Sequence, residues 1–333
     1  MGDAQNTGRS THVGPEKMPQ SSWRHSTGAR IFASPIQFND QLIVVALNGK
    51  VASLNTDGKL NWRVATSDKV YSTPAAANDD HRFFAASGKE IMAIDDNGTP
   101  LWTYEVPTAV DAPILVANDT VFVAASGIYA FTFDGELKWF APTEGHIRGA
   151  PVFHPAGFVV AATTDGVVHA FDNNGGPRWS LPVHSSVQSG LSVDPTLGTI
   201  YCGTDRGKLV AISSLGKVLW EFETKGDIRG TPAVDRNSNI IFGSYDQYIY
   251  ATDPEGKLLW RVATTGRVRA SARVDARGNI YIGSQDNFIY ALSSAGQLLW
   301  RFNIGQDVDA TVEISADGTL YVGADDGAIH ALR

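Results

Sequence analysis

Eight tryptophans recur along the chain at nearly constant intervals, and this spacing constrains the fold more than any other feature of the sequence. The successive intervals are 39, 40, 37, 40, 41, 40 and 40 residues. A nearly constant period indicates a tandem array of one structural unit rather than a set of unrelated domains. The repeated residues are Trp23, Trp62, Trp102, Trp139, Trp179, Trp220, Trp260 and Trp300.

Each repeat contains the pattern of a small antiparallel sheet. Between residues 266 and 300, four short alternating segments are separated by clusters of turn residues: 268–272, 280–283, 288–291 and 298–300. A glycine stands four residues before every tryptophan except Trp23, as a tight hairpin with positive φ requires. Four strands in about 40 residues make one blade of a β-propeller, and no helical period competes with this prediction.

The two ends of the chain predict how the ring closes. Three strands follow Trp300, and the chain then ends without a fourth, whereas Trp23 has Pro19 in place of the hairpin glycine. We therefore predict an all-β, eight-bladed β-propeller of four-stranded antiparallel blades, in which the strand around Trp23 completes the blade formed by residues 301–333. Residues 18–333 form this single propeller. The alternative is seven blades with one unpaired strand.

The beginning of the chain and its charge predict where it acts. Residues 1–17 are polar and rich in Gly, Ser and Thr, which predicts a disordered tail. The formal net charge of -8 disfavours a nucleic-acid partner, and no apolar stretch is long enough to span a membrane. The start lacks the pattern of a secretory signal, so we expect a cytoplasmic protein, or a periplasmic one if a signal peptide has been removed.

Residues 93–102 and 251–260 carry an Ala, a turn, a Gly and a Trp in fixed order. This motif resembles the tryptophan-docking repeat of pyrroloquinoline-quinone-type propellers, and the resemblance extends from about residue 21 to residue 333. In the quinoprotein alcohol dehydrogenases of that superfamily, two adjacent cysteines typically lie beneath the cofactor. Here Cys202 is the single cysteine, so the resemblance implies neither bound quinone nor another cofactor. In size the chain is more similar to the non-enzymatic propeller lipoproteins of the bacterial outer-membrane assembly machine.

Function should depend on the position at which the repeats differ. The eighth residue after each tryptophan is always Val or Ile, and the tenth is always Ala, Ser or Gly, so both are predicted to be structural. The ninth residue, here called the ring position, lies between them and points to the opposite side of the strand. We predict that these side chains surround one mouth of the central channel: Phe32, Tyr71, Asp111, Arg148, Gln188, Arg229, Arg269 and Asp309.

The predicted ring is polar and rich in arginine. Together with the seventh position it contains six Arg or Lys residues and four Asp residues. Blades four apart face each other, which places Arg148 opposite Asp309 and Asp111 opposite Arg269. Forked guanidinium contacts favour a small anionic or carboxylated ligand, or a protein partner on this face of the propeller. A purely structural alternative is that Arg and Asp pair with each other and the aromatic residues close the channel.

Two classes of function remain open. The first, which we prefer, is a binding module that carries out no chemistry of its own. The second is an enzyme in which His146, Arg148 and Asp111 act as acid, base or anion stabiliser on a carboxylated or sugar-like substrate, as in a lyase, hydrolase or cyclase. No residue spacing predicts a metal site.

Overall fold

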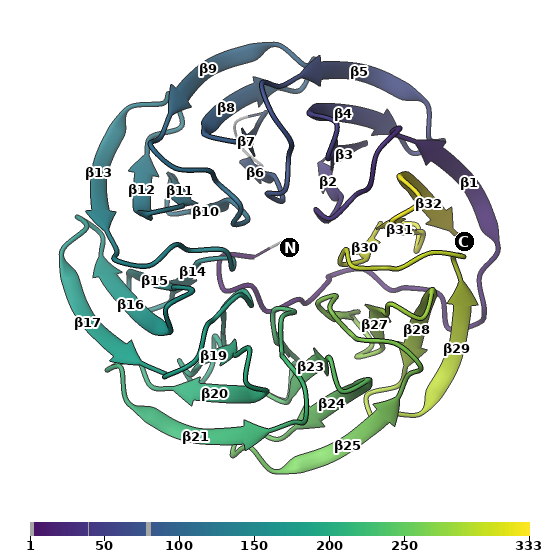
Figure 1. Cartoon of the computed structure of the whole chain (residues 1–333). Helices are drawn as coiled ribbons and strands as arrows, with labels where there is room; N and C mark the ends of the chain where they lie inside the picture. The colour runs from purple at the N-terminus through teal and green to yellow at the C-terminus, as the bar shows by residue number, and fades with distance from the viewer. Residues whose placement is uncertain (1–2, 39, 78–80) are drawn as a thin grey trace.

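The computed structural model describes residues 3–38, 40–77 and 81–333. In this part of the chain, β-strands form eight four-stranded antiparallel sheets arranged as a ring, and no helix is present (Figure 1). The predicted eight-bladed propeller is confirmed. The outermost strand of each blade is the one that carries the tryptophan, and its side chains are mostly exposed, whereas the second and third strands are largely buried.

The strands of the blades are given from the channel outwards. The innermost strands are β2 (Ile36–Phe38), β6 (Ala75–Ala77), β10 (Leu115–Ala117), β14 (Val152–His154), β18 (Ser192–Val193), β22 (Ala233–Val234), β26 (Arg273–Val274) and β30 (Glu313–Ile314). The second strands are β3 (Gln41–Ala46), β7 (Arg82–Ser87), β11 (Thr120–Ala124), β15 (Phe158–Ala162), β19 (Ile200–Gly203), β23 (Ile240–Ser244), β27 (Ile280–Gly283) and β31 (Leu320–Gly323).

The remaining two strands complete each sheet on its outer side. The third strands are β4 (Lys50–Asn55), β8 (Glu90–Asp95), β12 (Gly127–Phe131), β16 (Val167–Asp172), β20 (Lys208–Ile212), β24 (Tyr248–Thr252), β28 (Phe288–Leu292) and β32 (Ala328–Leu332). The outermost strands are β5 (Leu60–Ala65), β9 (Pro100–Glu105), β13 (Leu137–Pro142), β17 (Pro177–Pro182), β21 (Val218–Glu223), β25 (Leu258–Ala263), β29 (Leu298–Asn303) and β1 (Ser21–Ser26).

The ring closes in the way that was predicted from the two ends of the chain. Strand β1 is antiparallel to β32, and Trp23 lies opposite Ala331. Next to this pair, Gln20 and Arg333 exchange two main-chain hydrogen bonds of 2.7 and 2.9 Å. The N-terminal strand therefore supplies the outermost strand of the last blade and leaves β32 without an open edge.

Every tryptophan except Trp300 packs on the outer hairpin of the following blade. Trp62 donates a hydrogen bond from Nε1 to the carbonyl oxygen of Asp96, at 2.9 Å. Gly98 lies in the same hairpin with φ +86°, and a Cβ atom there would come within 2.6 Å of the Trp62 ring. Glycine is thus required both by the turn and by the close approach of the indole. The contact recurs from blade to blade and joins neighbouring sheets.

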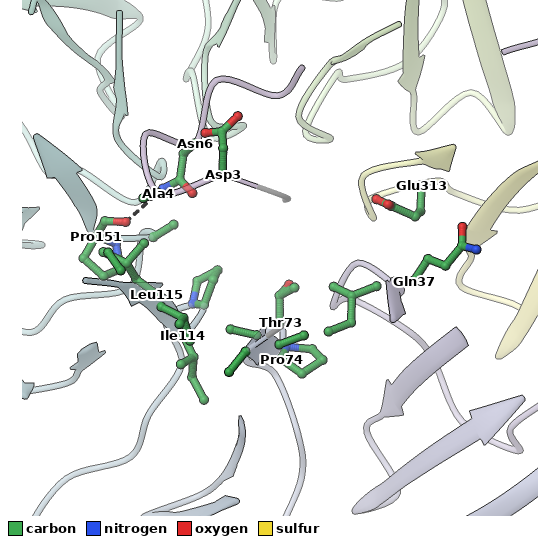
Figure 2. A pocket seen from close by; sticks show the side chains of 18 of the residues that line it. Asp3, Ala4, Asn6, Gln37, Thr73, Pro74, Ile114, Leu115, Pro151 and Glu313 are labelled. Carbon is green, nitrogen blue, oxygen red and sulfur yellow. Dashed lines mark hydrogen bonds between the residues drawn. The ribbon is translucent and has the colours of Figure 1, made fainter. Parts of the chain in front are cut away.

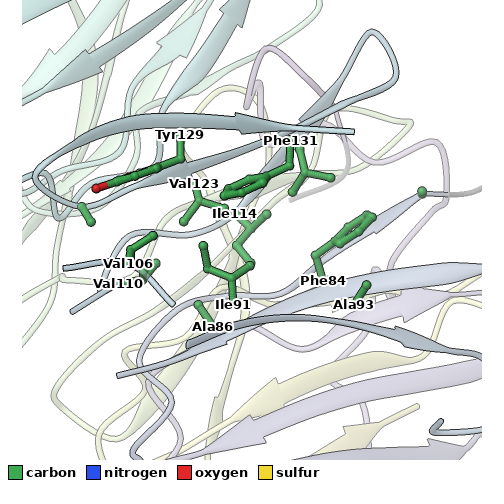
Figure 3. Close-up of a cluster of buried hydrophobic side chains, with 13 residues drawn as sticks. Phe84, Ala86, Ile91, Ala93, Val106, Val110, Ile114, Val123, Tyr129 and Phe131 are labelled. Carbon is green, nitrogen blue, oxygen red and sulfur yellow. The ribbon is translucent and has the colours of Figure 1, made fainter. Parts of the chain in front are cut away.

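The hydrophobic core lies between blades rather than within one sheet. Figure 3 shows one cluster, in which Phe84 and Ile91 of one blade pack with Val123 and Phe131 of the next. All of these side chains are fully buried. Each blade therefore buries its apolar faces only when both neighbours are present, as in other repeat folds.

The N-terminal tail, residues 3–20, differs from the disordered segment expected for residues 1–17. From Asp3 onwards it follows the channel-facing edges of β14, β18, β22 and β26 (Figure 1). The blade that follows Trp300 has no hairpin between its third and outermost strands, because β1 comes from the N-terminus, and the Trp300 indole instead donates to the carbonyl oxygen of Pro15 at 2.8 Å. Main-chain groups of the tail fill hydrogen-bonding positions that the fold leaves open, and amino-acid composition does not reveal such pairing.

Candidate functional site

All eight ring residues line a single cavity of about 510 Å³ at one end of the channel, here called the ring mouth. The residues on either side of them explain this convergence. The eighth residues after the tryptophans, such as Ile31 and Val268, are at most 2% exposed, and the tenth residues are buried as well. With both neighbours fixed between blades, the ring side chain points toward the channel.

The arginines of the ring mouth bind carboxylates of neighbouring blades rather than of opposite ones. Arg148 Nε lies 3.6 Å from Asp111 Oδ2, and Arg269 Nη1 lies 3.6 Å from Asp309 Oδ2. The ion pairs are partly exposed, since the Arg148 side chain keeps 53% of its surface accessible. Among the described residues, the ion pairs of Arg148 and Arg269 thus join side chains of adjacent blades.

Arg229 belongs to a denser polar network. Its guanidinium lies 3.2 Å from Asp205 and 3.1 Å from Asp227. Gln188 Nε2 donates to the same Asp205 carboxylate at 2.6 Å. Asp205 is the twenty-sixth residue after Trp179, a position that is Asp in five repeats and that therefore indicates a structural turn residue rather than a member of the ring.

Three other side chains near the ring share a fixed distance from tryptophan, which the sequence alone could have revealed. Tyr245, Gln285 and Asp325 each follow a tryptophan by 25 residues, a second position at which the repeats differ. Tyr245 lies beneath the guanidinium groups of Arg229 and Arg267, each 5.2 Å from the ring centroid. Gln285 donates to Asp309 at 2.9 Å. Tyr245 and Gln285 thus support ring side chains from the adjoining loops, whereas Asp325 pairs with Arg30, two residues before Phe32.

Two aromatic residues occupy one sector of the ring mouth. The ring centroids of Phe32 and Tyr71 are 6.2 Å apart, and the planes are tilted by 33°. Tyr71 is 42% exposed, and the Arg269 guanidinium lies 5.4 Å from the Phe32 centroid. The sector is an accessible aromatic surface beside a cation, on which an aromatic side chain can pack.

The pKa values of the two ring carboxylates, Asp111 and Asp309, are shifted in opposite directions. Burial raises the pKa of Asp309 above its ordinary value, although Arg269 and Gln285 oppose the change. The contact with His146 lowers the pKa of Asp111, and the charge of Arg148 adds to the effect. The ring mouth thus has one carboxylate held in its charged form and one whose charged form is disfavoured.

The structure brings the three candidate catalytic residues together. His146 Nε2 and Arg148 Nε lie 3.5 and 3.6 Å from the same Asp111 oxygen. All three are at least 28% exposed. No group of three or more His, Cys, Asp or Glu side chains in the described part of the chain could hold a metal ion.

The sequence profile described as outer membrane protein assembly factor BamB matches residues 17–149, 164–244 and 245–333. The chain belongs to the BamB family. A search of curated protein sequences finds no match. No helix of the described residues is long and apolar enough to cross a membrane.

Solved structures with the same fold include both BamB and redox enzymes. BamB from Moraxella catarrhalis superposes with a TM-score of 0.78 at 19% identity, over 95% of this chain and 97% of that one. The computationally designed Ika8 protein gives a TM-score of 0.82 at 16% identity, covering 94% and 99%. Quinohemoprotein alcohol dehydrogenase from Comamonas testosteroni gives 0.82 at 13% identity, covering 99% and 79%. These likenesses show the fold alone, so the family assignment depends on the profile match.

Proposed function

We propose that this BamB-family propeller is a binding module without chemistry of its own, and that its ring mouth receives a side chain or short segment of a protein partner. The observation that carries the proposal is the convergence of all eight ring residues on one cavity of about 510 Å³. The ring position is where the repeats differ, whereas the positions beside it are kept small or β-branched for packing. Variation among residues that line one cavity is typical of a binding surface carried by a fixed scaffold.

A protein partner fits the ring mouth better than a free small anion. Arg148, Arg229 and Arg269 each have a carboxylate within 3.6 Å, so a small anion would have to displace an internal partner. A protein segment can instead add contacts to Tyr71 and exchange hydrogen bonds at the rim of the ion pairs. The same arginines are the groups that would bind a small carboxylated ligand, and the experiment below also tests such a ligand.

The family also supports a protein partner and a place of action. The profile that matches the chain describes an outer membrane protein assembly factor. We propose on this basis that the protein works in the cell envelope, on the periplasmic side of an outer membrane, rather than in the cytoplasm. Fractionation of the cells that make the protein would test the location, and recovery with the cytoplasmic fraction would contradict it.

A photo-crosslinking experiment tests the proposal at the ring mouth. A photoreactive phenylalanine analogue is placed at Tyr71 or, as a matched control, at Leu215, which is 71% exposed in a hairpin turn of the outer rim. We expect one protein to crosslink at position 71 and not at position 215, and the crosslink to weaken when Arg229→Ala is added. Equal crosslinking at both positions would contradict the proposal. Stabilisation by small carboxylates that Arg229→Ala abolishes would favour the anionic ligand instead.

A second candidate function is supported by the contact among Asp111, His146 and Arg148. A carboxylate that orients an imidazole beside a guanidinium is a usable acid–base group. The exposure of all three gives little exclusion of water, which makes this function the weaker one. Turnover of a carboxylated or sugar-like substrate that His146→Gln abolishes, while substrate binding persists, would establish the enzyme and overturn the binding module.

A further inference from the structure

The end of the channel opposite the ring mouth contains a second cavity, of about 490 Å³, here called the tail groove. Figure 2 shows its walls: Ala4 and Asn6 of the tail lie on one side, and Thr73 and Leu115 beside the inner strands on the other. The groove follows β2, β6 and β10, the part of the ring that the tail does not cover. Thr73, Pro113 and Ala150 line both cavities, so the two meet within the channel.

The tail reveals how an inner edge binds extended polypeptide. Phe153, Val193, Val234 and Val274 are the fourteenth residues after their tryptophans, and each donates its main-chain N–H to a tail carbonyl oxygen. The distances are between 2.8 and 2.9 Å. The acceptors are the carbonyls of Ala4, Gln5, Thr7 and Gly8, so five consecutive residues cover four blades.

At three of these edges, the main-chain carbonyl oxygen also accepts a hydrogen bond from the tail. Gln5 Nε2 donates to Phe153 at 3.2 Å, and Arg9 Nε donates to Val234 at 2.8 Å. Val274 accepts from the main-chain N–H of Ser10 at 2.7 Å. Each such edge therefore offers one donor and one acceptor, and the tail satisfies both with main-chain, amide or guanidinium groups.

The same groups recur where no tail is present. Ala76 and Val116 are also fourteenth residues after a tryptophan, and both line the tail groove. They pair with Phe83 and Val121, in the register in which Phe153 pairs with Val159. Because ladder bonds alternate along an antiparallel pair, their N–H and C=O groups point away from the sheet, as those of Phe153 do. In the described chain, neither amide donates to a group outside its own sheet.

A buried cation at one end of the groove also has unused donors. Arg273 is 3% exposed and lines the cavity. Its Nη2 donates to Glu313 at 2.8 Å, whereas Nε and Nη1 have no hydrogen-bond partner within the described chain. Buried guanidinium donors without acceptors are costly, so this end of the groove favours a ligand that carries oxygen acceptors.

We propose that the tail groove binds an extended segment of a partner protein by β-strand addition, continuing around the ring the arc that the tail begins. Carbonyl oxygens of the segment accept hydrogen bonds from the N–H groups of Ala76 and Val116, and a further carbonyl accepts from Arg273. In the tail, acceptors for neighbouring edges are one or two residues apart, so two or three residues of the segment cover the edges of Ala76 and Val116. This site is separate from the ring mouth and does not depend on the function proposed there.

The walls of the groove specify the chemistry of the segment. Ala75, Ala76 and Ala77 leave room but offer no deep pocket, which favours small side chains. The tail satisfies equivalent edges with Ala, Gln, Asn, Thr and Gly, so a polar, small-residue segment fits. Asp119 is exposed at the rim and favours one basic residue in the segment.

The test uses the whole protein and a capped peptide with the sequence AQNTGRS, that of residues 4–10. We expect binding with a Kd below about 1 mM. Hydrogen exchange should become slower at the amides of Ala76 and Val116 on addition of the peptide, while those of Val193, Val234 and Val274 are protected already. Val116→Pro removes the donor, and proline is tolerated on edge strands, so affinity should fall about fivefold to tenfold. Val116→Ala keeps the N–H and should bind nearly as wild type does.

A second variant and three other outcomes distinguish this proposal from its alternatives. Arg273→Lys keeps a positive charge beside Glu313 but removes the free donors, so it should also weaken binding of the peptide. Absence of binding, or protection confined to the edges that the tail already covers, would overturn the proposal. Protection of Ala76 and Val116 without peptide, rising with protein concentration as a dimer forms, would assign the groove to a second copy of the chain instead.

Discussion

The two ends of the channel are lined by different chemical groups. The ring mouth is built from side chains that change from blade to blade, such as Tyr71, Asp111 and Arg229. At the other end the tail binds main-chain groups that are equivalent in every blade it crosses. Side-chain chemistry can be specific for one partner, whereas edge hydrogen bonds accept many sequences of suitable size. The two proposals together thus give the propeller a selective mouth and a more permissive groove.

The strongest test of this difference removes residues 1–25. The change deletes the tail and most of β1, which exposes β32 as an open edge and leaves the Trp300 indole without its acceptor. We expect aggregation, or a melting temperature about 10 °C or more below that of the full chain. Thermal unfolding followed by circular dichroism measures the effect. A truncated protein that melts like the full chain would refute the account of ring closure.

A smaller loss of stability is expected from Asn6→Ala, which acts only at the tail end of the channel. The Asn6 amide donates to the carbonyls of Pro151 and Leu191 at 2.9 and 3.1 Å, and the side chain is 6% exposed. Loss of two buried hydrogen bonds should cost about 2–3 kcal/mol in urea unfolding.

Asn6→Gly serves as the matched variant for this test. Asn6 has φ +49°, a conformation that glycine adopts without strain and alanine does not. We therefore expect Asn6→Gly to be less destabilising than Asn6→Ala by about 1 kcal/mol. If neither variant changes stability, the tail contributes nothing at this edge and the contrast between the two ends fails.

At the ring mouth, two carboxylates should respond to pH with opposite sign. The pKa of Asp309 is raised on folding, so its contribution to stability is complete below the ordinary value of 3.8 and is lost as pH rises through the folded pKa. The pKa of Asp111 is lowered, so its contribution is present above 3.8 and is lost as pH falls through the folded pKa.

Melting temperatures of Asp309→Asn and Asp111→Asn between about pH 3 and about pH 6 measure these contributions. Relative to wild type, Asp309→Asn should gain stability as pH rises, and Asp111→Asn should lose it, each by about 1 kcal/mol or less. Curves that shift in the same direction would show that burial and the His146 contact do not set the two pKa values.

The smallest effect on stability is expected for Arg148→Ala. The Arg148 side chain is 53% exposed, and its contact with Asp111 is 3.6 Å long. Exposed ion pairs of this kind contribute about 0.5 kcal/mol or less. The variant should therefore unfold like wild type in urea and yet bind the partner of the ring mouth less well. A loss above about 2 kcal/mol would assign Arg148 to the structure rather than to recognition.

The sequence predicts the ring mouth better than the tail for a physical reason. Tryptophan spacing sets the register of every repeat, so counting from Trp220 or Trp260 places Arg229 and Arg269 at the same mouth. The tail binds through carbonyl groups of residues such as Ala4 and Gly8, and main-chain groups leave no pattern in the sequence. A segment rich in Gly, Ser and Thr therefore resembles a disordered one.

The repeat pattern also could not predict which carboxylate each ring arginine pairs with. Arg148 and Arg269 were expected to face carboxylates on opposite blades, but each lies beside one on a neighbouring blade. That choice depends on the width of the mouth and on side-chain length, which a linear period does not contain. Asp205 joins the site from a loop between the second and third strands of its blade, at a position where Asp recurs in five repeats and so does not stand out as part of the ring.

The pairing of Trp23 with Ala331 also determines when the protein can finish folding. For a protein that acts in the periplasm, as proposed above, this pairing must wait until both ends of the chain have reached that compartment. Until then the first strand has no partner, although the middle blades can already pack on one another. A translation product that stops early lacks β32 and cannot close, so it carries an exposed edge that a protease or chaperone can detect. Closure by the two ends thus marks the completed chain.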